Sequence, residues 1–131
     1  MTLLDVVKTI HLLAASVWTG GLIVLGVLVF ALRKAGAERP LLQASARAFA
    51  NASWTAMVVA ALSGAGMVDM MHLGWDHPKL RLKLGLVVAA AALAAFHQGT
   101  ARDTPPAVRG IFEVLILLVS VAIFGAAARI M

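Results

Sequence analysis

Cysteine and tyrosine are both absent from this chain of 131 residues. Without cysteine there is no disulfide, no thiolate metal ligand and no thiol nucleophile. Without tyrosine a common radical carrier and proton donor is missing. Charged residues make up only 13% of the chain, too few for a soluble domain of this size to cover its core. No Walker loop, dinucleotide fingerprint, HExxH motif or nucleophile elbow occurs, so hydrolytic and nucleotide chemistry have no support.

Apolar residues dominate instead, at 62% of the chain with a mean hydropathy of +0.95. They form blocks of about 20 to 25 residues, the pattern of membrane-spanning helices and not of barrel strands. We therefore expect an all-α fold, an integral membrane antiparallel four-helix bundle that forms one transmembrane domain over residues 1–131. The expected spans cover residues 3–32, 44–71, 79–98 and 107–129.

The connections carry turn and helix-start signals. Pro40 suits the first turn of a helix, and the amphipathic stretch Leu41–Asn51 after it is expected to lie partly at the membrane interface. Gly, Asp and Pro predict a turn over His72–Pro78, and a second break is expected over Gly99–Pro106. Met1–Lys8 carries an acidic residue and precedes a long apolar run, so we expect a retained first span and not a signal peptide.

The net charge is +5, and the basic residues gather at the ends of the expected spans. Contact with anionic headgroups of the lipid bilayer explains them more simply than nucleic acid does. Four spans place both termini on one side, end A, together with the loop between spans 2 and 3. The positive charge of the first loop, at end B, favours a cytoplasmic end B. We expect a bacterial-type inner membrane protein with its termini on the non-cytoplasmic side.

The first span carries residues that a simple anchor does not need. His11 and Trp18 lie seven residues apart on one stripe of the helix, and Gly20 and Gly21 leave space for a flat ligand or a neighbouring helix. An ionisable residue inside a span is a candidate functional residue, and imidazole is the commonest metal and haem ligand. The alternative is that His11 only hydrogen-bonds another helix.

A second group of candidate ligands closes the second span. Its thioethers share one helix face by their i, i+3, i+4 spacing and are followed by two histidines. The members are Met67, Met70, Met71, His72 and His77. Thioether and imidazole ligands together suit copper, especially Cu(I), or haem iron. In the alternative interpretation the methionines fill gaps at a helix end and the loop histidines are solvated.

Further candidates lie in the last two spans. His97 shares a stripe with Lys83, but we expect it to differ from His11 in height by roughly 14 Å, too far for one metal ion. His97 would then belong to a second site, or steady a ligand near Arg47 and Arg102. Arg109 and Glu113, four residues apart, are expected either to form an ion pair, or to hold an anionic group and shuttle protons.

The segment His11–Gly21, HLLAASVWTGG, resembles the first-helix signature of the copper-resistance CopD family. Ser63-Gly64 and the segment Lys83–Leu86 also fit that pattern, and the resemblance covers nearly the whole chain. It implies a stand-alone core domain that binds or transports copper without being an enzyme. A periplasmic metal carrier or redox partner protein, and a second copy of the chain, are the partners expected.

The layout is also similar to that of the HemJ-type protoporphyrinogen oxidases, small four-helix proteins that bind haem b. His11 matches their first-span histidine, Lys83 and His97 their third-span pair, and Arg109 with Glu113 their Arg-then-acid pattern. This resemblance implies electron transfer or porphyrin oxidation, with His11 as an axial haem ligand and Met67, Met71 or His97 opposite. A structural subunit of a larger membrane complex is a third possibility.

Overall fold

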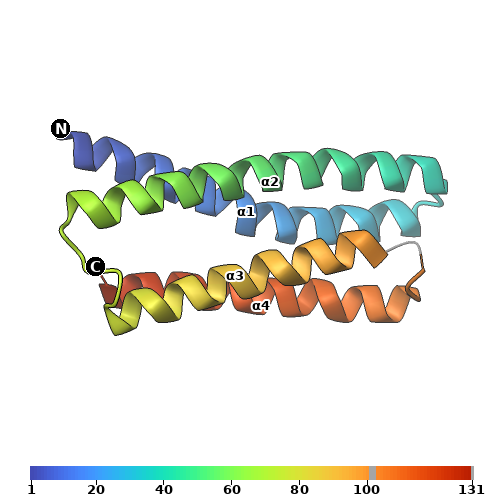
Figure 1. The fold of residues 1–131 in the computed structure, drawn as a ribbon. Coiled ribbons are helices and arrows are strands. Elements are labelled where there is room, and N and C mark those ends of the chain that lie inside the picture. Colours follow the sequence, from blue (N-terminus) through green and yellow to red (C-terminus); the bar gives the residue numbers. More distant parts are fainter. Residues whose placement is uncertain (101–102, 131) are drawn as a thin grey trace. The chain divides into compact units, whose positions relative to one another are not determined.

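The computed structural model describes residues 1–100 and 103–130, which are almost entirely helical. Four helices follow one another along the chain (Figure 1): α1 (Leu3–Lys34), α2 (Arg39–Met70), α3 (Pro78–Thr100) and α4 (Pro106–Ile130). All four are long and apolar enough to cross a membrane. The predicted all-α fold is confirmed, and the helices are compatible with a four-helix bundle in a multi-pass membrane protein.

The helices group into two compact units, Met1–Leu73 and Gly74–Met131. Within each unit, two helices lie side by side and run antiparallel, joined by a short connection (Figure 1). The single transmembrane domain expected over the whole chain stays a prediction.

Both ends of α1 are closed by hydrogen bonds of local residues. At the start, the Thr2 hydroxyl accepts from the Asp5 amide (3.2 Å) and the Asp5 carboxylate accepts from the Thr2 amide (2.8 Å), a capping box. At the end, Gly36 adopts φ 81°, and the Ala37 amide donates to the Leu32 carbonyl at 2.9 Å. This is a Schellman motif with glycine at its left-handed position.

The end of α2 repeats that motif with a histidine in place of the glycine. His72 has φ 55°, its amide donates to the Asp69 carbonyl (3.2 Å), and the Leu73 amide donates to the Val68 carbonyl (3.0 Å). A residue with a Cβ is uncommon in this conformation, although histidine is among the more tolerant types. The turn predicted over residues 72–78 is confirmed, and it begins with this left-handed residue.

The helix bounds refine two of the predicted connections. α2 begins at Arg39, with Pro40 in its first turn, so the amphipathic Leu41–Asn51 stretch is the first part of α2. The membrane span expected from residue 44 stays a prediction. At 32 residues, α2 is about 48 Å long and exceeds the roughly 30 Å of a hydrocarbon core. The break expected over residues 99–106 is narrower, because α3 continues to Thr100 and α4 begins at Pro106. Residues 101 and 102 lie outside the described residues.

Candidate functional site

His11 of α1 is fixed against one face of α2. Its Nδ1 lies 2.9 Å from the carbonyl oxygen of Ala60 and 3.1 Å from the hydroxyl oxygen of Ser63. The ring also packs onto Gly64, where a Cβ would stand only 3.1 Å from the His11 Cε1 atom. The glycine therefore lets the half-buried imidazole approach the backbone of α2 closely enough to hydrogen-bond it.

The hydrogen bond to Ala60 determines which nitrogen of His11 carries the proton. A carbonyl oxygen only accepts, so Nδ1 must be the donor. The Ser63 hydroxyl donates to the Val59 carbonyl at 2.7 Å and leaves its oxygen to accept. Metal ligation requires a neutral imidazole, and with the proton on Nδ1 the ring's lone pair is then on Nε2. Metal-ligating histidines are commonly held in this way, by a backbone acceptor on the second nitrogen.

Two tryptophans pack against each other in the same helix pair. Trp18 is 5% exposed and meets Trp54 of α2 edge to face, with ring centroids 5.5 Å apart. Gly21 faces α2 as well, since a Cβ there would lie 3.4 Å from the Ser53 hydroxyl oxygen, whereas a Cβ on Gly20 would meet nothing within 4 Å. Of the two uses expected for the glycine pair, Gly21 provides the close approach of a neighbouring helix.

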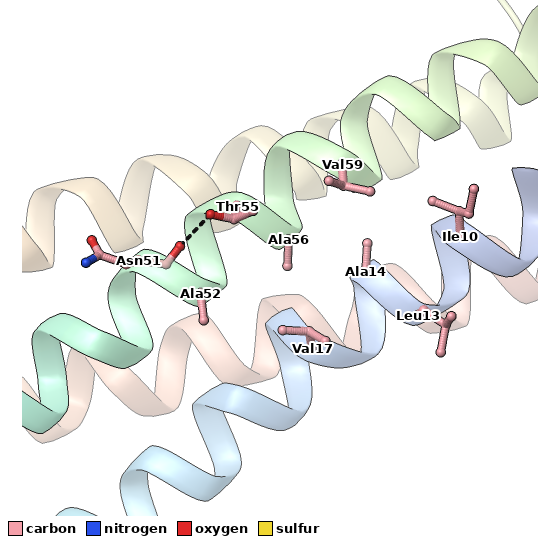
Figure 2. A pocket seen from close by; sticks show the side chains of 9 residues that line it. All are labelled: Ile10, Leu13, Ala14, Val17, Asn51, Ala52, Thr55, Ala56 and Val59. Atoms are coloured by element: carbon pink, nitrogen blue, oxygen red, sulfur yellow. Dashed lines mark hydrogen bonds between the residues drawn. The ribbon is translucent and has the colours of Figure 1, made fainter.

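An open, almost wholly apolar hollow of about 560 Å³ lies between α1 and α2 (Figure 2). Its lining residues are Ile10, Leu13, Ala14, Val17, Asn51, Ala52, Thr55, Ala56 and Val59. His11 is not among them. The candidate ligand therefore does not line the hollow.

The methionines continue the stripe of α2 that holds His11. Met67 and Met71 follow Gly64 by three and seven residues, the spacing of one helix face, and Met67, Met70 and Met71 are all half-buried. Met67 lies about 4.5 Å, roughly one turn, beyond Gly64 along the axis. His11 is thus level with Ala60 and Gly64, and the thioethers begin one turn further toward the end of α2.

The two loop histidines have different surroundings. His72 is exposed at the end of α2. His77 belongs to the second unit, where its Nδ1 accepts a hydrogen bond from the Lys79 amide at 3.2 Å and caps the start of α3. Among the described residues no group of three or more His, Asp or Glu side chains could hold a metal ion. A metal site in the first unit would therefore depend on thioether ligands.

In the second unit, His97 of α3 faces α4. Its Nε2 lies 3.8 Å from Glu113 Oε1, and its ring stacks on Phe112 with centroids 6.0 Å apart. The ion pair considered for Arg109 and Glu113 is not seen; the Glu113 carboxylate contacts His97 instead. Lys83 is half-buried on the same stripe of α3 as His97. Arg102, expected near His97, lies outside the described residues.

No protein-family model, curated protein or solved structure matches this chain. The resemblances to the CopD and HemJ families therefore stay predictions that rest on the residues quoted for them.

Sequence reasoning missed two partners of the site, Trp54 and the Ala60 carbonyl. The short connection between α1 and α2 contains the signal that finds them, because a tight antiparallel hairpin fixes the register of its helices. His11 lies 23 residues before the end of α1 at Lys34, and Leu62 lies 23 residues after the start of α2 at Arg39. Counting the same number of residues from the connection along each helix therefore leads from His11 to the turn of α2 that it contacts.

Proposed function

We propose that this integral membrane protein binds copper, as Cu(I), through His11 Nε2 and the thioether sulfurs of Met67 and Met71. The observation that carries the proposal is the hydrogen bond from His11 Nδ1 to the Ala60 carbonyl, because it puts the lone pair on Nε2. The stripe of α2 that holds the imidazole continues into Met67 and Met71. The resemblance of His11–Gly21 to the CopD first-helix signature supports the same conclusion.

The ligand chemistry favours Cu(I) over harder ions. Thioethers bind soft metals, and imidazole suits copper, whereas Mg²⁺ and Ca²⁺ require several oxygen ligands. The chain has no cysteine, which leaves methionine as its sulfur donor. The site lies where α1 begins and α2 ends, the end proposed to face the non-cytoplasmic side of a bacterial-type inner membrane. There a periplasmic metal carrier would reach it, for binding or transport of the ion.

A Cu(I) titration of the purified protein against a coloured chelator tests the proposal. His11→Asn is the informative variant, because an asparagine amide replaces the Nδ1 donor but not Nε2. We expect one equivalent of Cu(I) on the wild type and at least a tenfold lower affinity for His11→Asn and Met67→Leu. Met57→Leu, a half-buried methionine earlier on α2, is the matched control and should bind as the wild type does. Equal affinity of wild type and His11→Asn would overturn the proposal.

The second candidate is a haem b protein for electron transfer or protoporphyrinogen oxidation. The Nε2 lone pair also suits haem iron, and the HemJ-type layout matches His11. The colour of the purified protein separates the two candidates. A Soret band that disappears in His11→Ala would favour the haem candidate and contradict the copper proposal. A colourless protein that binds Cu(I) and loses it with Met67→Leu would exclude the haem candidate.

A further inference from the structure

A charged cluster joins the end of α3 to the start of α4 in the second unit and contains none of the proposed copper ligands. Glu113 Oε1 lies 3.8 Å from His97 Nε2, and Phe112 stacks on the histidine ring. Arg109 precedes Glu113 by four residues on the same face of α4. Glu113 therefore contacts His97 of the neighbouring helix and shares a face of α4 with Arg109.

Two nitrogen atoms of this cluster are buried without a hydrogen-bond partner, His97 Nδ1 and Arg109 Nε. Buried polar atoms are satisfied in the great majority of cases, so an exception indicates a missing partner. Arg109 Nε is always a donor, so its missing partner is an acceptor. His97 Nδ1 donates or accepts according to the tautomer of the ring.

The charge of the cluster also favours an anionic partner. Glu113 is paired with His97, and within the described residues no carboxylate lies within 4 Å of the Arg109 guanidinium. The positive charge of Arg109 is thus without a local counter-ion, in the first turns of α4, where the helix dipole also favours an anion. The carboxylate approaches the imidazole at Nε2, so it does not occupy the opposite side of the ring, where Nδ1 lies.

We infer that Arg109 and His97 bind a phosphate-type anion, either the headgroup phosphate of an anionic lipid or free phosphate. The guanidinium fork matches two phosphate oxygens, with Arg109 Nε as one of the donors. When His97 Nδ1 carries a proton, it supplies a further donor to the same anion. The site contains no proposed copper ligand, so its test is independent of the copper proposal.

Two binding arms on the full-length protein test this site. In the lipid arm, native mass spectrometry counts phosphatidylglycerol retained against phosphatidylcholine. In the phosphate arm, thermal stability is measured in phosphatidylcholine nanodiscs with millimolar inorganic phosphate. Arg109→Gln removes the fork, and His97→Gln keeps a group near Nε2 but removes the Nδ1 donor. We expect both variants to bind the anion at least tenfold more weakly than the wild type.

The matched controls are His97→Asn, which retains a donor at the Nδ1 position, and Arg81→Gln, which removes an exposed arginine of α3. Both should bind within about twofold of the wild type. A loss confined to the lipid arm identifies a headgroup site, and a loss confined to the phosphate arm identifies a free-anion site. If Arg109→Gln and Arg81→Gln behave alike in both arms, the inference is wrong. If Arg109→Gln does not fold, Arg109→Lys, which keeps the charge without the fork, takes its place with the same expected loss.

Discussion

The two helix pairs of this protein are built from different contacts. The α1–α2 pair is joined by a histidine-to-backbone hydrogen bond, a tryptophan pair and two close glycines, Gly21 and Gly64. The α3–α4 pair has its polar and aromatic contact, that of His97 with Glu113 and Phe112, at one end, and small or aliphatic side chains fill its interior. The most buried residues there are Ala90 (0% exposed), Ala94 (4%), Ile116 (2%) and Ser120 (1%).

The difference separates two ways of associating helices in lipid. Without a hydrophobic driving force between helices, either small side chains let backbones pack closely or polar groups bond across the interface. Small-residue packing tolerates little added volume. A directional bond such as that from His11 to Ala60 fixes the orientation of one side chain and places a proton on its Nδ1.

Removing an aromatic partner of the first pair should have the largest effect on stability. Trp18→Ala is expected to lower the free energy of unfolding by about 3 kcal/mol, the usual cost of deleting a buried aromatic ring. Denaturant unfolding in detergent, followed by circular dichroism, measures it. Trp75→Ala is the control, because that side chain is 50% exposed, and it should change stability by less than about 0.5 kcal/mol. Similar losses for both variants would show that the Trp18–Trp54 contact does not stabilise the pair.

Adding volume to the second pair should come next. Ala90→Leu inserts three carbon atoms at a position that is 0% exposed, and overpacking of this kind costs about 1–3 kcal/mol. Ala92→Leu makes the same change at an exposed position of α3. The same unfolding experiment should find Ala92→Leu close to the wild type. Tolerance of Ala90→Leu would mean that close backbone packing does not hold α3 against α4.

The smallest effect contrasts two glycines of α2. Gly66→Ala should raise the free energy of unfolding by up to about 1 kcal/mol, because alanine favours the helix and a Cβ there meets nothing within 4 Å. At Gly64 the new Cβ would stand 3.1 Å from the His11 ring. Gly64→Ala should therefore not raise the free energy of unfolding, and it should move the imidazole. The histidine ring resonances in an NMR spectrum report the movement. A Gly64→Ala protein as stable as Gly66→Ala, with unshifted His11 resonances, would contradict the close packing.

The helices were largely predictable from the sequence because hydrophobic length and turn residues are local signals. Pro40 correctly marked the first turn of α2. The membrane span expected from residue 44 stays a prediction, because a helix of this length extends beyond a hydrocarbon core. Gly36 marks the end of α1 by residue type alone. His72 fills the equivalent position at the end of α2 without any such signal.

The candidate site was predictable only in part. His11 and Trp18 stand out as unusual residues in an apolar run, but their partners depend on the register between two helices. The acceptor of His11 is a backbone carbonyl, and because every residue has one, the residue type gives no signal of it. For Glu113, local spacing favoured Arg109 as its partner, whereas packing of α3 on α4 brings His97 to it.

X-ray absorption at the copper edge of the Cu(I)-loaded protein tests the central claim most directly. We expect one imidazole and at least one sulfur in the first coordination shell of the wild type. In His11→Asn the imidazole scattering should disappear, and in Met67→Leu the sulfur contribution should fall. Imidazole scattering that persists unchanged in His11→Asn, or a wild-type shell without sulfur, would contradict copper binding by His11 and the methionines of α2.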